Sequence, residues 1–237
     1  TARIAETKPT IQYLRDHGAK IVILAHFGRP KGQVNETMRF QPIVPTISQV
    51  LGCEVKYCSD PIGEIVKQTI SKLQPGDILL LENIRFYPGE ESNDSEFAKQ
   101  LASLGNIYVN DAFGAAHRAH ASTAGIAAYL PHAAGLLMQR EVEHLTKVLT
   151  QPEHPVVAII GGAKISTKLA LIKNLLPKVD QLLLGGALAN TVMLANGYDV
   201  KQSLVERDLV DTVKNLLSDK LLLPSDVVWG DDRILDI

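Results

Sequence analysis

Residues 155–168 read PVVAIIGGAKISTK: a continuous apolar run, a pair of glycines, and then a segment that enters a helical pattern. A continuously apolar run is typical of a strand that is covered on both faces of its sheet. Paired glycines where a strand turns into a helix allow the backbone to approach a ligand closely. This stretch therefore predicts a strand–turn–helix unit of a parallel α/β sheet.

The same organisation recurs along the chain. Further strand-like runs occupy residues 20–26, 77–83, 106–111, 181–186 and 226–230, with a weaker one at 54–58. Signals for the starts of helices lie between the runs. Thr7 is expected to cap one helix, with Pro9 in its first turn, and Asp60 and Pro61 are expected to begin another, with Ile65 on its apolar stripe. Asn93 and Glu96 have the spacing of a capping box for a third helix. Alternating strands and helices predict an α/β fold built from doubly wound parallel sheets.

A boundary between two lobes is expected near residues 131–154. Pro131 and Gly135 precede a charged helical segment, and the sequence QPEHP at 151–155 follows it before a new strand begins. We therefore expect an N-terminal domain at 1–137, an interdomain helix and linker at 138–154, and part of a C-terminal domain at 155–237. The fold expected is two Rossmann-like lobes, the second truncated.

Composition excludes several classes of protein. The formal net charge is −2 over 237 residues, so no overall basic field favours a nucleic-acid partner. Cys53 and Cys58 fit neither a zinc pattern nor a disulfide framework, which favours a reducing, cytoplasmic setting. The N-terminus shows no leader pattern, and the most apolar stretch, 125–138, is too short and mixed for a membrane span.

Basic side chains follow three of the predicted strands in the first lobe. The carboxyl ends of parallel strands share one sheet edge, where ligands bind in open sheets. That edge would receive His26, Arg29, Arg85, His117 and Arg118, and Arg3 could join them. Convergent arginines repel one another unless an anion lies between them, and the guanidinium group pairs well with carboxylate or phosphate. The set predicts a site for a small, multiply charged anion; each arginine taken singly could instead pair with an acid such as Glu82 or Asp111.

The second lobe presents glycines and lysines. Gly161 and Gly162 end one strand, and Gly185 and Gly186 end the next. Lys164 and Lys168 are expected on one face of the following helix, within its first turns, where lysine opposes the helix dipole unless a phosphate binds. The pattern predicts binding of nucleotide phosphates. The alternative is that the glycines serve close helix–sheet packing and that both lysines extend into water.

Other chemistries lack their motifs. The sequence contains no GxxxxGK[ST] phosphate loop, no GxGxxG turn after a strand and no GxSxG elbow. His117 and His120 lack the glutamate of a zinc-hydrolase motif. A dehydrogenase or sugar-phosphate enzyme that uses the same sheet edge stays open as a second hypothesis.

Five segments together resemble the phosphoglycerate kinase family. In chain order they are HFGRP (26–30), LLLENIRFYPGEE (79–91), VNDAFGAAHRAHAST (109–123), AAGLLMQ (133–139) and GGAKISTK (161–168). The resemblance extends along essentially the whole chain. It implies a two-lobed enzyme that transfers a phosphoryl group reversibly between ATP and 3-phosphoglycerate, giving ADP and 1,3-bisphosphoglycerate.

The resemblance also implies roles for individual residues. The phosphoglycerate-binding residues would be Arg3, His26, Phe27, Gly28, Arg29, Arg85, His117 and Arg118. The nucleotide-binding residues would be Gly162, Ala163, Lys164 and Lys168. Arg3 and Lys164 would bracket the transferring phosphoryl group as the catalytic pair.

Two parts of the family pattern are absent from the chain: a first strand with its Asp-Phe-Asn motif, and most of the C-terminal lobe. The resemblance places the protein ligand of the Mg²⁺ that accompanies ATP or ADP in the latter, outside this chain. A phosphoglycerate-binding fragment without activity is therefore an alternative. We further expect a monomer with neither nucleic-acid nor membrane partners.

Overall fold

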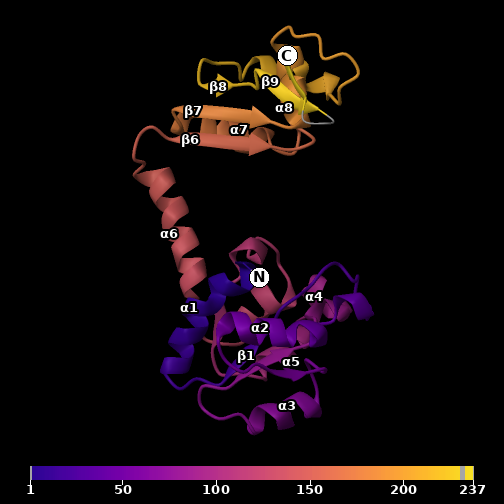
Figure 1. The fold of residues 1–237 in the computed structure, drawn as a ribbon, viewed down its shortest axis with the longest axis vertical. Coiled ribbons are helices and arrows are strands. Elements are labelled where there is room, and N and C mark those ends of the chain that lie inside the picture. Colours follow the sequence, from indigo (N-terminus) through magenta and orange to yellow (C-terminus); the bar gives the residue numbers. More distant parts are fainter. Residues whose placement is uncertain (1, 230–232, 237) are drawn as a thin grey trace. The chain divides into compact units, whose positions relative to one another are not determined.

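The computed structural model describes residues 2–229 and 233–236. The chain divides into two compact units, residues 1–144 and residues 145–237. Helix α6 (Leu136–Thr150) contributes residues to both units. Figure 1 shows the ribbon with its elements labelled.

The first unit is built on a parallel three-stranded sheet with the order β1-β3-β2. The strands are β1 (Ile21–Ile23), β2 (Lys56–Cys58) and β3 (Ile78–Leu81), and β3 pairs with both neighbours. All four residues of β3 are buried, as the continuously apolar pattern predicted.

Helices cover both faces of this sheet. Ile78 and Leu80 of β3 pack in one apolar cluster with residues of α1 (Ala2–Asp16) and α2 (Val44–Leu51). Leu79 and Leu81 pack in a second cluster with Val66 of α3 (Glu64–Ser71). Because successive strand residues point to opposite faces, β3 joins the two cores.

The rest of the first unit carries short elements around this sheet. Helices α4 (Pro88–Glu91) and α5 (Ser95–Ala102) follow β3. Strands β4 (Tyr108–Asn110) and β5 (His132–Ala134) form a separate parallel pair. Strand β5 was not predicted, because its residues HAA are exposed and carry no apolar pattern.

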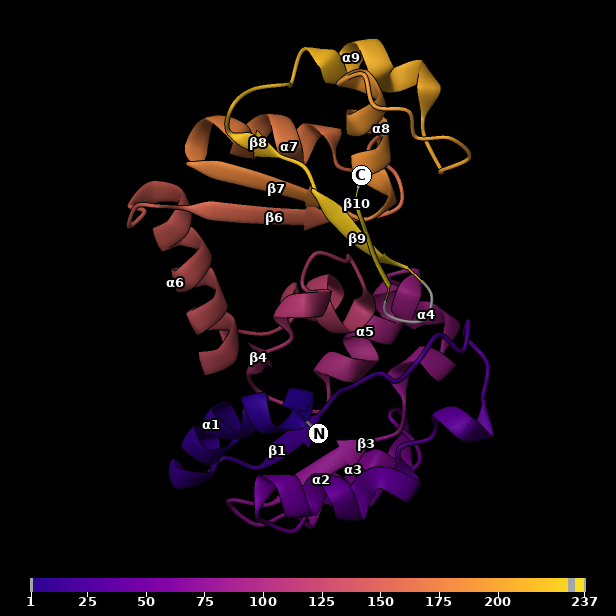
Figure 2. The same ribbon diagram turned by 45° about the horizontal axis from the view of Figure 1, so that its top comes forward.

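The second unit repeats the design in a parallel sheet with the order β6-β7-β8, which can be followed in Figure 2. Its strands are β6 (Val157–Gly161), β7 (Gln181–Gly185) and β8 (Leu221–Leu222). Helices α7 (Leu169–Leu175), α8 (Ala187–Ala195) and α9 (Val210–Lys214) contribute Ile172, Leu188 and Val213 to its core. The two parallel sheets and their helices confirm the predicted α/β, Rossmann-like fold class.

One strand signal has a different partner from the one expected. Residues 226–229 form β9 (Asp226–Trp229), which pairs in antiparallel fashion with β10 (Arg233–Asp236). The sequence indicated a further strand of the parallel type here, and β10 was not foreseen. Gly230, the last residue of the predicted run, lies outside the described residues.

Three predicted helix starts are wrong by a few residues. Thr7 and Pro9 lie inside α1, where the Thr7 hydroxyl donates to the Ile4 carbonyl at 2.9 Å. Helix α3 begins at Glu64, after Gly63 with its φ of 94°, rather than at Asp60–Pro61. This leaves Ile65 60% exposed, off the apolar stripe.

The third misplaced start concerns α5. Asp94, not Asn93, caps this helix: its carboxylate accepts the N–H of Phe97 at 2.8 Å. Asn93 has a φ of 55°, which asparagine tolerates better than most residues. Such starts depend on single side-chain hydrogen bonds, which the apolar pattern does not reveal.

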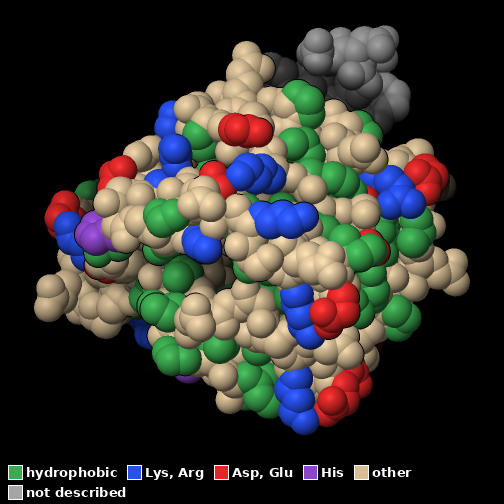
Figure 3. Space-filling model, turned by 90° about the horizontal axis from the view of Figure 1, so that it is seen from below, with side chains coloured by type: hydrophobic (Ala, Val, Ile, Leu, Met, Phe, Trp, Pro, Cys, Tyr) green, Lys and Arg blue, Asp and Glu red, His purple; other side chains and the backbone are tan. Residues whose placement is uncertain are grey.

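Charge is mixed over the surface seen in Figure 3, where Lys and Arg side chains lie beside Asp and Glu and are separated by hydrophobic groups. Among the helices of the described residues, none has the length and apolarity that crossing a membrane requires.

Candidate functional site

Arg85 is the centre of a group of basic side chains in the first unit. It lies in a 3-10 turn (Ile84–Phe86) directly after β3, and its side chain is only 3% exposed. One nitrogen, Nη1, donates to the Gly28 carbonyl at 2.9 Å, whereas Nε and Nη2 are buried without a hydrogen-bond partner. Glu91 Oε1 lies 3.5 Å from Nε, beyond good hydrogen-bond range. A buried guanidinium with unused donors is the arrangement expected where an anion binds.

Four other basic residues act electrostatically in the same region. We name Arg85, His26, Arg29, Arg118 and His120 the basic cluster. Burial lowers the pKa of the Arg85 guanidinium most, and Arg118 and Arg29 lower it further, while Glu91 and Glu90 oppose them.

The pKa of His26 is lowered by burial and by the positive charges of this cluster. Desolvation by neighbouring protein atoms lowers its pKa to about 4, and the charges of Arg85, Arg118 and His120 act in the same direction. His26 is therefore neutral at pH 7 in the absence of ligand. A bound phosphate would favour the protonated form and raise this pKa.

Hydrogen bonds from the exit of β3 hold the loop that carries His26, Phe27, Gly28 and Arg29. The Asn83 amide donates to the carbonyls of Phe27 at 2.8 Å and Met38 at 3.0 Å. Gly28 has a φ of 67°, and a Cβ there would lie 2.6 Å from Met38 Sδ, so the position requires glycine. The loop is thus fixed at both ends against β3.

Glu82, also at the exit of β3, anchors the same loop at its far end. It is 2% exposed and accepts the N–H of Phe40 at 2.9 Å and the hydroxyl of Tyr57 at 2.8 Å, and Arg39 pairs with it at 3.1 Å. Burial alone would raise the pKa of Glu82, but these hydrogen bonds outweigh burial and lower it. Glu82, one of the acids that could have paired with an arginine of the cluster, is therefore paired with Arg39 instead.

The remaining predicted phosphoglycerate residues are more exposed. Phe27 is 47% exposed, and His117 lies beside Arg118, whose Nε is 3.4 Å from His117 Nε2. Arg3 is exposed in the first turn of α1. Within the described residues, no hydrogen bond or ion pair joins Arg3 to the basic cluster, so its role stays a prediction.

Sequence reasoning missed His120 as a member of the cluster. Its spacing from His117 was weighed only as a metal pair. The signal that could have found it is its place after the same strand as Arg118, on the segment 117–120.

The second unit brings its two glycine pairs together at the carboxyl ends of β6 and β7. Gly161 and Gly185 are partners in the sheet, and Leu188 N–H donates to the Gly162 carbonyl at 2.9 Å. Gly186 has a φ of 68°, and a Cβ there would lie 3.0 Å from the Gly162 carbonyl oxygen. The backbones therefore pack so closely that position 186 requires glycine.

Lys164 and Lys168 are not placed as the sequence predicted. Helix α7 begins only at Leu169, so both lysines lie in the preceding turn rather than on one face of the helix. Ile165, fully buried between them, anchors this turn to the core. Lys164 is exposed, Lys168 is half-buried, and within the described part of the chain neither forms an ion pair.

A carboxylate from a distant segment helps to hold this turn. Glu206 accepts the N–H of Ser166 at 2.9 Å and its hydroxyl at 2.6 Å. These hydrogen bonds lower the pKa of Glu206, and the charge of Lys164 adds to the effect. Glu206 N–H in turn donates to the buried Thr191 hydroxyl at 3.0 Å. Sequence reasoning missed Glu206 because it lies forty residues from Ser166.

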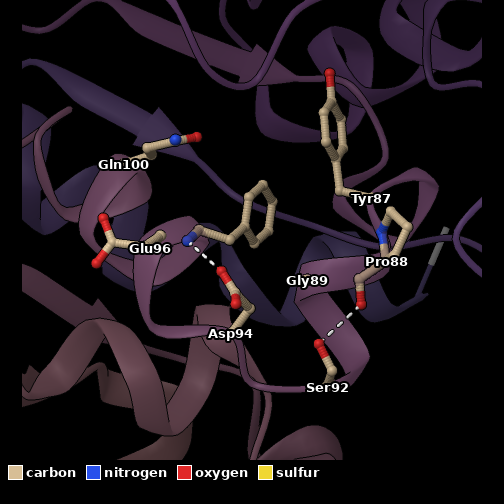
Figure 4. A pocket seen from close by; sticks show the side chains of 8 residues that line it. Tyr87, Pro88, Gly89, Ser92, Asp94, Glu96 and Gln100 are labelled. Atoms are coloured by element: carbon tan, nitrogen blue, oxygen red, sulfur yellow. Dashed lines mark hydrogen bonds between the residues drawn. The ribbon is translucent and has the colours of Figure 1, made fainter.

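A shallow depression between α4 and α5 does not suit the same chemistry. It encloses about 390 Å3 and is lined by side chains that include the carboxylates of Asp94 and Glu96 (Figure 4). Asp94 caps α5, and the Ser92 hydroxyl donates to the Pro88 carbonyl at 3.1 Å. An acidic lining disfavours phosphate, so we place no anion there.

Over the described residues 2–229 and 233–236, no group of three or more His, Cys, Asp or Glu side chains could hold an ion. We therefore assign none of these residues to the Mg²⁺ that accompanies a nucleotide. The location of its protein ligand stays a prediction.

Parallel sheets that present a basic cluster in one unit and a glycine–lysine turn in the other are the arrangement expected of an α/β protein whose phosphorylated ligands bind at strand ends. The sequence profile of the phosphoglycerate kinase family matches residues 1–234. The chain therefore belongs to the phosphoglycerate kinase family, and the resemblance seen in the sequence is confirmed. The dehydrogenase hypothesis finds no support.

Curated relatives and solved structures agree. The chain is 53% identical to a phosphoglycerate kinase of Moorella thermoacetica and 48% identical to one of Pelotomaculum thermopropionicum, in each case over 95% of this chain and 59% of the relative. The structure of phosphoglycerate kinase from Coxiella burnetii matches 99% of this chain with a TM-score of 0.79 at 38% identity, over 62% of its own length. The enzyme from Pyrococcus horikoshii matches all of this chain with a TM-score of 0.84 at 30% identity, over 63% of its own length. The chain thus spans about three fifths of these relatives.

Proposed function

We propose that the protein to which this chain belongs transfers a phosphoryl group reversibly between ATP and 3-phosphoglycerate, giving ADP and 1,3-bisphosphoglycerate. The observation that carries the proposal is Arg85, a buried guanidinium with two nitrogens that lack a hydrogen-bond partner, inside a cluster of basic side chains. Family membership supports the active enzyme over a fragment that only binds.

Each unit has its own ligand in this proposal. Phosphoglycerate binds to the first unit through Arg3, His26, Phe27, Gly28, Arg29, Arg85, His117 and Arg118, and His120 belongs to the same cluster. The nucleotide phosphates bind to the second unit at Gly162, Ala163, Lys164 and Lys168. We accordingly propose domains at 1–137 and 155–237, with residues 138–154 as the helix and linker between them.

For this reaction the protein has to align the two substrates and neutralise the negative charge on the transferring phosphoryl group. A carboxylate oxygen of 3-phosphoglycerate forms a bond to the γ-phosphorus while the bond to the β-bridging oxygen breaks and ADP leaves. The nucleophile carries no proton, so no general base is required. Arg3 and Lys164 neutralise the charge on the transferring oxygens, and Mg²⁺, when bound with the nucleotide, neutralises charge on its phosphates.

We place the protein in the cytoplasm as a monomer, with no nucleic-acid or membrane partner. The free thiols of Cys53 and Cys58 support a reducing compartment. Size-exclusion chromatography with light scattering tests the monomer.

Arg118→Ala is expected to weaken 3-phosphoglycerate binding more than tenfold and to leave ATP binding unchanged. Removing a charge-assisted partner of a carboxylate or phosphate costs about 1.5–3 kcal/mol. Isothermal titration calorimetry with each ligand measures both affinities, and Arg207→Ala, an exposed arginine outside the cluster, is the matched control. Equal losses for the two ligands would contradict the assignment of phosphoglycerate to the first unit.

A further inference from the structure

A buried carboxylate, Glu90, lies behind the basic cluster and has no role in the function proposed above. Its side chain is 1% exposed, at the end of the short helix α4. Oε1 accepts the Ser122 hydroxyl at 2.7 Å, and Oε2 accepts the Ser122 N–H at 3.0 Å. His120 Nδ1 lies 3.5 Å from Oε1. Burying a carboxylate costs free energy of folding unless the carboxylate is well hydrogen-bonded. Both oxygens of Glu90 accept their hydrogen bonds from Ser122, in the turn at residues 121–125.

That turn, residues 121–125, determines the path of the segment that carries Arg118 and His120. The Thr123 hydroxyl donates to the Arg118 carbonyl at 2.7 Å and accepts the His120 N–H at 3.0 Å. The Tyr108 hydroxyl donates to the Ser122 carbonyl at 2.8 Å. The turn is thus held from one side by β4 and from the other by Glu90.

Glu90 connects two parts of the cluster that come from different strands. Arg85 lies in the turn after β3, five residues before Glu90, while Arg118 and His120 follow β4. The charge of Glu90 also opposes that of the other cations at Arg85. Without Glu90, the contact between α4 and the 121–125 turn would lose a buried carboxylate that accepts two hydrogen bonds from Ser122.

We propose that Glu90 is a positioning residue for the phosphoglycerate site: through Ser122 it fixes Arg118 and His120 relative to Arg85. The proposal rests on the function proposed for the first unit. A carboxylate that merely stabilised the fold would lower the melting temperature when replaced, and would leave affinity for phosphoglycerate unchanged in the protein that remains folded.

The test uses a short series of variants. Glu90→Gln removes the charge and keeps the shape, Ser122→Ala removes the hydroxyl donor, and the double variant combines them. Glu96→Gln, an exposed glutamate of α5 that pairs with Lys99, is the matched control. Calorimetric titration with 3-phosphoglycerate and with ADP, together with thermal unfolding, is carried out on each.

We expect Glu90→Gln to weaken 3-phosphoglycerate binding about tenfold, because a charge-assisted hydrogen bond is roughly twice as strong as a neutral one. Ser122→Ala should weaken it about threefold, and the double variant should be no weaker than Glu90→Gln, since both changes act on one contact. ADP affinity should stay unchanged. In the full-length enzyme, the KM for 3-phosphoglycerate should rise while kcat at saturation stays within about twofold.

If the wild type binds 3-phosphoglycerate and both single variants bind it with the same affinity, the positioning role of Glu90 is overturned and the proposed function is not. Additive losses in the double variant would overturn that role as well. If Glu90→Gln does not fold, Ser122→Ala decides by the same criterion. Absence of phosphoglycerate binding by the wild type would instead overturn the proposed function, and this inference with it.

Discussion

Lys164→Ala in the full-length enzyme should lower kcat by roughly 10²–10³-fold while changing neither KM by more than a few-fold. Lys164 is exposed in the turn between β6 and α7, next to the paired glycines, with its ammonium group free of ion pairs among the described residues. Its charge can therefore meet the phosphoryl group in transit, where only stabilisation of the transition state raises kcat.

Steady-state kinetics with both substrates varied measures this effect. Lys168→Ala should instead raise the KM for nucleotide, because that lysine is half-buried at the base of the turn and is proposed to bind the phosphates. Lys173→Ala, an exposed lysine within α7, is the matched control. Near-normal turnover of Lys164→Ala would remove its catalytic role.

The polypeptide of residues 1–237, studied alone, should bind 3-phosphoglycerate and show no measurable kinase turnover. The basic cluster lies wholly within the first unit. In the second unit, Ile159 of β6 is 75% exposed and Val157 is 47% exposed, so the residues that the structure describes leave this apolar sheet face uncovered. A sheet with such a face is prone to loosening or association, so the glycine–lysine turn would not be held as catalysis requires.

A coupled assay that follows formation of 1,3-bisphosphoglycerate tests this expectation, with a full-length version of the protein as the positive control. Since the chain spans 59% of the length of a curated relative, comparing residues 1–237 with the full-length protein shows what activity these residues have by themselves. Turnover by residues 1–237 within tenfold of that control would contradict the prediction.

The sequence predicted the features that rest on pattern. Continuous apolar runs predicted β3 and β6, and the strand-edge rule for parallel sheets predicted that His26, Arg85 and Arg118 lie in one cluster. The sequence also predicted that each glycine pair ends a strand, and the structure adds that Gly161 and Gly185 are partners in the sheet. These features depend on the period and order of residues, which a single sequence contains.

Features that depend on one distant contact were not predictable. The turn at Lys164 precedes rather than begins α7, and Glu206 holds it from another segment. Glu90 and Ser122 meet although they lie 32 residues apart. Asp94 rather than Asn93 caps α5 because one carboxylate reaches one N–H. No local pattern distinguishes these acids from ordinary surface acids.

Titration of His26 tests whether the basic cluster binds phosphoglycerate. Proton NMR of the imidazole signal against pH, assigned with His26→Gln, should give a pKa of about 4 in the free protein. Saturating 3-phosphoglycerate should raise this pKa, because a bound anion offsets the charges of Arg85 and Arg118 that lower it. By linkage, binding should then take up protons between the two pKa values. If His26 has the same pKa with and without 3-phosphoglycerate, binding of phosphoglycerate at the basic cluster is contradicted.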